Sequence, residues 1–469
     1  MADQDLAFAG LARQAEAVRA GEVSPRELVR LHLERIGRLD PQLNAFRVVR
    51  AEPALAAAVE AEKRRYSNGQ APLLGVPIAV KDVQDVAGEL TTYGTGCFEK
   101  PATEDCEMVK RLRAAGAIVI GKTNLPELAF AMFTESPTWG VTRNPWNMER
   151  TPGGSSGGSG AAVAAGLVAA ATASDGAGSI RYPAAYCSLF GLKPQRGRIP
   201  LDPDTEHWHG MSAYGCLTRS VLDTALFLDA TAGGGKAPDK PPPPGRPFAE
   251  AARTPPGRLR VAVSVKGTRV LAPPILDPLC RRAVEETAEL LGSLGHQVAW
   301  RDPDWGTVGN GVSIMYARGV ADDARRLPNR ERLGRQVRGV ARLGSLIPDW
   351  TLRRARAAIP KHAARINRIF DEHDVLLLPM VGEPPLPVGK WDSRGGQWTL
   401  AGMTRRTGFG PSWNYLGNPS AAVPAGFTDD GLPLSVQLVG RPNDEATLLS
   451  LAAQLEAERP WADRRPPVG

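Results

Sequence analysis

Short apolar runs separated by helical patterns recur along the chain, and they predict its fold class. Residues 75–80 and 117–122 are rich in Val, Ile and Ala, as buried strands are, and residues 106–115 between them have a helical pattern. Similar patterns predict further strands at 259–263, 375–379 and 434–440, and further helices at 52–65, 278–292 and 444–456. The alternation of strands and helices predicts an α/β fold with a central sheet.

The first 65 residues are expected to form a helical segment that packs on the core. Ser24 is a suitable N-cap and Pro25 fits the first position of the helix that follows. Residues 66–469 are expected to form one domain. Within it, residues 233–258 are rich in Pro and Gly, which predicts a surface connection without regular structure.

Composition and charge exclude several classes of protein. The 469 residues are 42% hydrophobic and 6% aromatic, as is typical of a globular protein. The net charge is +7, and positive residues gather between Arg318 and Arg368. Acidic residues are interleaved there and no nucleic-acid motif accompanies them, so we interpret this region as solvated helix faces and expect no nucleic-acid partner.

Other classes are excluded by what the sequence lacks. The five cysteines are scattered, without the spacing of a metal site or a disulfide framework, so we expect buried reduced thiols, no metal and no cofactor. The N-terminus has no apolar core of a signal peptide, and the sequence has no apolar run of membrane-spanning length. We therefore expect a cytoplasmic protein without a membrane partner.

A loop rich in Gly and Ser is the first candidate for chemistry. Residues 153–160 read GGSSGGSG, and an Ala-rich run at 161–173, interpreted as a helix, leads to a second Gly-Ser turn at 176–179. A phosphate-binding loop would need a Lys that is missing here, and a dinucleotide fingerprint would need a different glycine spacing. An active-site loop is favoured, and a flexible linker stays open as the alternative.

Amide hydrolysis would need a nucleophile, a base and donors for the oxyanion. None of the six histidines adjoins a GxSxG nucleophile turn, although one could still lie nearby in the fold. Lys81 ends an apolar strand, where loss of solvent favours the neutral amine that can act as a base. The same position is also typical of an ordinary surface lysine, so the residues alone leave the base open.

Several separated motifs closely resemble the amidase signature family, and together they cover most of the chain. They lie at 75–82, 121–127, 140–200, 217–220, 414–419, 431–433 and 437–440. The resemblance implies a single large core with a central mixed β-sheet covered on both faces by helices. It is weakest over residues 300–412, which we therefore expect to be a variable, mainly helical region, whose aromatic residues could cap the site.

The resemblance also implies which residues do the chemistry. Ser179 matches the nucleophile, Ser155 the bridging serine that follows a cis peptide bond, and Lys81 the base. The backbone N–H groups of Gly176, Ala177, Gly178 and Ser179 match the oxyanion hole. Supporting roles fall to Ser156, Asp175 and Arg181, and the acyl pocket to Ala129, Phe130, Met132, Phe133 and Thr134. Ala177 departs from the family, which usually has glycine there, and its methyl group is expected to narrow the acyl site.

The expected activity is hydrolysis of a linear, small-molecule amide, with a hydrophobic or aryl acyl group, through an acyl-serine intermediate. Two alternatives stay open: a glutaminase subunit of a tRNA-dependent amidotransferase, and a catalytically silent binding protein on the same fold. A homodimer is an open alternative for the oligomeric state.

Overall fold

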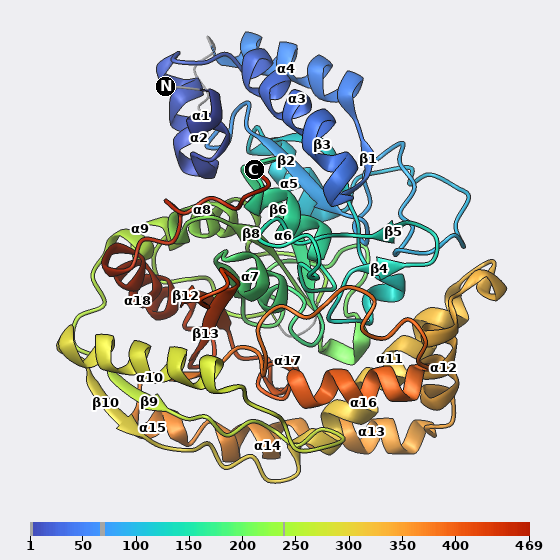
Figure 1. Ribbon diagram of the computed structural model, residues 1–469, viewed down its shortest axis with the longest axis vertical. Coiled ribbons are helices and arrows are strands. Elements are labelled where there is room, and N and C mark those ends of the chain that lie inside the picture. Colours follow the sequence, from blue (N-terminus) through green and yellow to red (C-terminus); the bar gives the residue numbers. More distant parts are fainter. Residues whose placement is uncertain (1–2, 66–70, 238–239) are drawn as a thin grey trace.

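The computed structural model describes residues 3–65, 71–237 and 240–469 (Figure 1). The N-terminal region holds helices α1 (Asp3–Ala7), α2 (Gly10–Ala20), α3 (Pro25–Leu43) and α4 (Ala51–Arg65). Helix α3 begins with a capping box in which the Ser24 and Glu27 side chains each accept the other's backbone N–H. Arg35 of α3 donates to the carbonyls of Ala165 and Gly166, which fixes the helix to the core. A domain division at residue 65 stays a prediction.

The first large sheet contains the two strands predicted at 75–80 and 117–122. Its strands are β1 (Phe46–Val49), β3 (Ile118–Thr123), β2 (Pro77–Lys81), β6 (Ala170–Asp175) and β8 (Ala213–Thr218), in that spatial order. Strand β2 lies parallel to β3 and β6, whereas β1 and β8 pair antiparallel at the two edges. Strand β1 is a strand of the core that the helical prediction for the first 65 residues missed.

The second large sheet lies beside the first. Its strands are β10 (Gln297–Trp300), β9 (Arg260–Val263), β11 (Val375–Pro379), β13 (Pro433–Gly440), β12 (Ser420–Phe427) and β7 (Gly191–Lys193), in that order. Phe190 and Thr218 exchange backbone hydrogen bonds of 3.0 and 3.3 Å and so join the two sheets at their edges. The predicted α/β fold with a central mixed sheet is confirmed, and helices surround the strands (Figure 1).

The remaining elements cover the sheets and connect them. Around the sheets lie α5 (Glu107–Ala114), α6 (Gly157–Ala164), α7 (Arg181–Cys187), α8 (Val221–Thr231), α10 (Pro278–Ser293) and α18 (Glu445–Glu458). Short pieces are η1 (Glu127–Ala129), η2 (Trp208–Gly210), η3 (Arg330–Arg332) and the hairpin of β4 (Glu135–Ser136) with β5 (Gly140–Val141). Among the described helices, none combines the length and the apolar character needed to cross a bilayer.

Two predictions of local structure were wrong. The Ala-rich run at 161–173 is not one helix, because α6 ends at Ala164 and the chain then enters strand β6. Gly166, with φ of +66°, turns the chain there, and pairing of β6 between β2 and β8 overrides the helix preference of alanine.

The Pro- and Gly-rich connection at 233–258 contains helix α9 (Phe248–Arg253), so the prediction of no regular structure fails for these residues. The Asp229 carboxylate accepts the N–H groups of Phe248 and Ala249 at 2.7 and 2.9 Å, which stabilises the first turn, and Phe248 is buried. Residues 238–239 of the connection lie outside the described residues.

Residues 300–412 are mainly helical, as expected, except that they also contain β11, a strand inside the second sheet (Figure 1). The helices of this region are α11 (Val308–Arg326), α12 (Arg335–Ser345), α13 (Asp349–Ala357), α14 (Ile359–Ile366), α15 (Ile369–Glu372), α16 (Gly396–Arg406) and the start of α17 (Pro411–Leu416). Helix α12 packs against both α11 and α16, so these three helices form one unit.

Candidate active site

Lys81 is a fully buried amine at the end of β2. Its Nζ lies 2.8 Å from Ser155 Oγ and 2.9 Å from Ser174 Oγ, so two hydroxyl groups contact the amine. Burial lowers the pKa of Lys81 to about 7, although the nearby Asp175 carboxylate acts in the opposite direction. A substantial fraction of the amine is therefore neutral near pH 7, and the neutral amine can accept a proton.

The double-serine loop leads directly into α6 and contacts the end of β2 through Lys81. The Gly154–Ser155 peptide bond is cis, and Ser155 is buried with its Oγ against Lys81. Ser156 Oγ donates to the Ser174 carbonyl at 3.3 Å and accepts the Ser174 N–H at 3.4 Å, which fixes the loop to β6. Thr134 Oγ1 donates to the Gly153 carbonyl at 2.9 Å and holds the loop from its other end.

The turn from Gly176 to Ser179 follows directly after β6. Gly178 has φ of +125°, and a Cβ at this position would lie 2.1 Å from the Tyr182 ring, so only glycine fits. Its N–H, which the resemblance assigned to the oxyanion hole, donates instead to Asp175 Oδ1 at 2.5 Å. Within the described part of the chain, the N–H groups of Gly176, Ala177 and Ser179 meet no protein acceptor, which leaves three donors for an oxyanion.

Ala177 occupies the position where the resemblance leads one to expect glycine. Its φ is not positive, so the backbone there accepts a side chain without strain. Its carbonyl accepts a 2.6 Å hydrogen bond from Tyr182 Oη, and Ala177 lines the large cavity beside Ser179. The extra methyl group therefore belongs to the wall of that cavity.

A buried ionic network supports the turn from behind. Arg181 and Asp175 are both fully buried and joined by hydrogen bonds of 2.9 and 3.0 Å. Burial alone would raise the pKa of Asp175, but Arg181 and Asn414 lower it to about 2, so the carboxylate stays ionised. Arg181 also donates to Asn414 and Gln437, both at 2.6 Å.

Ser174, Asn414 and Gln437 also contact the site residues, although no site role was predicted for them from the sequence. Ser174 and Thr172 are two residues apart in β6, so their side chains face the same side of the sheet. Ser174 Oγ contacts Lys81 Nζ, and Thr172 Oγ1 accepts the backbone N–H of Lys81 at 2.8 Å. Polar residues at alternate positions of an otherwise apolar buried strand are the signal that could have identified them. Asn414 and Gln437 carry a similar signal as amides within buried segments.

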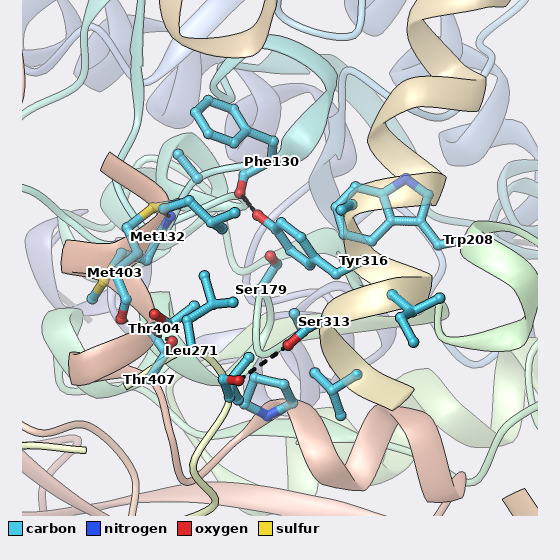
Figure 2. A pocket seen from close by; sticks show the side chains of 18 of the residues that line it. Phe130, Met132, Ser179, Trp208, Leu271, Ser313, Tyr316, Met403, Thr404 and Thr407 are labelled. Carbon is cyan, nitrogen blue, oxygen red and sulfur yellow. Dashed lines mark hydrogen bonds between the residues drawn. The ribbon is translucent and has the colours of Figure 1, made fainter. Parts of the chain in front are cut away.

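Ser179 lies between two cavities of different character. The apolar cavity, about 270 Å³, is bounded by residues 129–132 on the core side and by α11, α12 and α16 on the other (Figure 2). All residues that line it belong to the described part of the chain, and none of them is charged. The small cavity, about 30 Å³, is lined by Ser155, Ser174, Ser179, Ser212 and His207 among others.

The structure separates the five residues expected in the acyl pocket into two groups. Ala129, Phe130 and Met132 line the apolar cavity. Phe133 instead stacks on Trp391, with ring centroids 5.1 Å apart, and Thr134 holds the serine loop. Tyr316 of α11 lines the cavity, and its hydroxyl donates to the Phe130 carbonyl (Figure 2).

The other aromatic residues of the variable region lie away from the apolar cavity. Trp350 and Trp398 are exposed on the surface, and Trp413 is buried against Trp305. The expected aromatic cap therefore reduces to Tyr316.

One histidine lies near the nucleophile in the fold. His207 lines the small cavity, but one ring nitrogen is 2.9 Å from Ser212 Oγ and the other 3.0 Å from Asp323. Because both nitrogens have partners other than Ser179, His207 is part of the cavity wall.

Comparison with known proteins agrees with this geometry. The family model described as Amidase matches residues 27–449. The "Putative amidase AmiB2" of Mycobacterium tuberculosis is 50% identical over 470 residues, covering 99% of both chains. The 6-aminohexanoate-cyclic-dimer hydrolase of Paenarthrobacter ureafaciens is 35% identical, covering 97% of this chain and 95% of that one.

Solved structures give the same result. A structure of 6-aminohexanoate cyclic dimer hydrolase has a TM-score of 0.88 at 31% identity, covering 98% of this chain and 99% of the other. The peptide amidase of Stenotrophomonas maltophilia has a TM-score of 0.81 at 27% identity, with 98% of each chain covered. The chain belongs to the amidase family, the amidase signature enzymes, and is an amide hydrolase acting on carbon–nitrogen bonds.

Proposed function

We propose that this amidase hydrolyses a small-molecule amide with an apolar or aryl acyl group, using Ser179 as nucleophile, Ser155 as proton relay and Lys81 as base. The observation that carries the proposal is the buried Lys81 amine, which lies 2.8 Å from Ser155 Oγ and contacts hydroxyl groups where an ion-paired lysine would contact a carboxylate. Ser155 and Ser179 line the same small cavity.

The chemistry follows from these positions. Ser179 Oγ attacks the amide carbonyl carbon while Ser155 takes its proton and passes a proton to neutral Lys81. The N–H groups of Gly176, Ala177 and Ser179 bind the oxyanion. The relay then returns a proton to the amide nitrogen, the C–N bond breaks and the amine leaves. Water next attacks acyl-Ser179, which releases the carboxylic acid and restores the serine.

The apolar cavity supports the proposed acyl group. Its volume of about 270 Å³ exceeds the ~150 Å³ of an apolar cavity that holds benzene. An apolar acyl group there would be removed from water, which favours binding by ~0.8 kcal/mol per buried methylene. The same cavity disfavours the glutaminase alternative, because none of the described residues that line it could pair with the ammonium and carboxylate of glutamine.

A panel of aryl, alkyl and peptide amides tests the proposal with wild type and Ser179→Ala. We expect wild type to turn over apolar acyl amides and Ser179→Ala to lose about 10⁴-fold or more of kcat/KM. Full activity in Ser179→Ala would contradict the mechanism, and a preference for glutamine would contradict the substrate class.

A further inference from the structure

The two cavities at Ser179 are unequal in size and in the groups that they offer. The apolar cavity is about 270 Å³, whereas the small cavity is about 30 Å³. One buried water needs roughly 10–15 Å³ by such a measure, so the small cavity has room for about two or three waters. The hydroxyls of Ser155, Ser174 and Ser212 line it and can bond a small polar molecule.

The position of Ser155 decides which part of the substrate enters which cavity. The leaving nitrogen must receive its proton from Ser155, and Ser155 lines the small cavity only. The nitrogen and its substituents therefore point into the small cavity. The acyl group extends the other way, into the apolar cavity that Ala177 lines.

The walls of the small cavity are held by several contacts. His207 bonds Ser212 and Asp323, and Trp208 Nε1 donates to Asp323 at 2.7 Å. Trp208, like Ala129 and Ser179, lines both cavities. A butyl or phenyl group on the nitrogen would have to displace this anchored wall, since a packed wall accommodates extra carbon atoms only at a cost. Asp204, an exposed residue, also lines the small cavity.

We propose that the substrates are primary carboxamides with an apolar acyl group, so that the leaving group is ammonia. This inference rests on the proposed chemistry of Ser179, Ser155 and Lys81. The C–N bond breaks as the nitrogen takes the relayed proton, ammonia leaves through the small cavity, and one water enters the same cavity to hydrolyse the acyl group. The net reaction consumes one amide and one water and gives one carboxylic acid and one ammonia.

The test compares hexanamide with N-methyl- and N-butylhexanamide, which share one acyl group and differ only at the nitrogen. Wild-type kcat/KM is expected to be about 100-fold lower for the N-butyl amide than for hexanamide, with the N-methyl amide between them. His207→Ala removes part of the small-cavity wall and is expected to reduce this ratio to about 10-fold or less.

The matched control is His209→Ala. His209 lies two residues away and pairs with Asp322 at 3.2 Å, but it lines neither cavity. His209→Ala should leave the ratio of kcat/KM for hexanamide to kcat/KM for N-butylhexanamide unchanged. The inference is overturned by a wild-type ratio within about threefold. It is also overturned by a large ratio that His207→Ala leaves unchanged.

Failure of the inference and failure of the proposed function give different results. If wild type hydrolyses N-butylhexanamide as fast as hexanamide, and Ser179→Ala hydrolyses neither, only the primary-amide inference falls. If Ser179→Ala still hydrolyses hexanamide, or wild type hydrolyses no amide, the proposed function falls with it.

Discussion

Two buried lysines on neighbouring strands have opposite surroundings. Lys81 ends β2 and Lys122 lies near the end of the parallel strand β3, and both side chains are fully buried. Lys122 Nζ lies 2.7 Å from Asp82 Oδ1, and Arg47 reaches the other oxygen of the same carboxylate at 2.9 Å. The Lys81 amine instead contacts the hydroxyls of Ser155 and Ser174.

The alternation of side chains along a strand explains the difference. Lys122 is in register with Val80, so Lys122 and Lys81 point to opposite faces of the sheet. Asp82 follows Lys81 and pairs with Lys122 on the face away from the serines. Asp82 is the sequence neighbour of Lys81, and an ion pair between them would keep the Lys81 amine charged. The Asp82 carboxylate pairs with Lys122 instead.

A low pKa alone does not identify the base. Burial lowers the pKa of Lys193 to about 7 as well, but its Nζ donates to the Pro194 carbonyl. Burial also lowers the pKa of Lys122, against the pull of Asp82. Only Lys81, of these three, combines a lowered pKa with serine hydroxyls. The comparison therefore supports the proposed role of Lys81 in proton transfer and indicates a structural role for Lys122.

Lys81→Met is expected to have the largest effect. Removing the base should lower kcat/KM for an apolar amide by about 10⁴-fold. The free energy of unfolding should stay close to wild type or rise, because a methionine of similar size replaces a buried amine without an ionic partner. Steady-state kinetics and urea unfolding measure the two effects. Activity within tenfold of wild type would refute Lys81 as the base.

Lys122→Met should have the converse effect. It leaves the buried Asp82 carboxylate with one cation fewer and should lower the free energy of unfolding by about 3–5 kcal/mol. Below the unfolding transition, kcat/KM should remain within about tenfold of wild type, because the Lys122 amine contacts neither Ser155 nor Ser174. A Lys122→Met enzyme as inactive as Lys81→Met, yet folded, would remove the distinction between the two lysines.

A pH profile of kcat/KM distinguishes the role of Lys81 from that of Lys122 without a substitution in the active site. The pKa of Lys81 is lowered to about 7, and the neutral amine is the active form, so kcat/KM should rise with pH through about 7. Activity at pH 6 should be about tenfold lower than at pH 8. The inflection should persist in Lys122→Met. A profile that falls as pH rises through 7 would have the wrong sign for a lysine base.

Ser174→Ala should have the smallest effect. It removes one of the two hydroxyls on Lys81 Nζ and leaves Ser155 in place. The loss of one buried hydrogen bond predicts a decrease in kcat/KM of roughly 2- to 10-fold. A decrease as large as that of Lys81→Met would instead make Ser174 the relay. Steady-state kinetics with one amide decides between these outcomes.

Much of the fold could be predicted from the sequence. The strand 375–379 and the helix begun by Ser24 and Pro25 were placed correctly because their signals are local. The helix predicted over 161–173 was wrong. Alanine favours helices, but pairing with strands distant in sequence determines the structure of the second half of this segment. Helix α9 was missed because its first turn is stabilised by Asp229, which lies far from the helix in sequence.

The candidate site was only partly predictable, because local patterns identify some of its residues and pairing between distant strands positions the others. The Gly-Ser loop stands out locally, but the choice of Lys81 came from the family resemblance. Its partner Ser174 and the direction of Asp82 depend on the register of neighbouring strands, which a single sequence does not show. The apolar cavity depends on α11, α12 and α16, which lie far from Ser179 in sequence.

Labelling with a fluorophosphonate tests whether Ser179 is the nucleophile and Lys81 its base, because the reagent reacts with an activated serine and can be located by peptide mass mapping. We expect one phosphonyl group per chain, on the peptide that contains Ser179, with normal labelling in Lys122→Met, much slower labelling in Lys81→Met and none in Ser179→Ala. Labelling of another residue, or labelling that persists in Ser179→Ala, would contradict these roles.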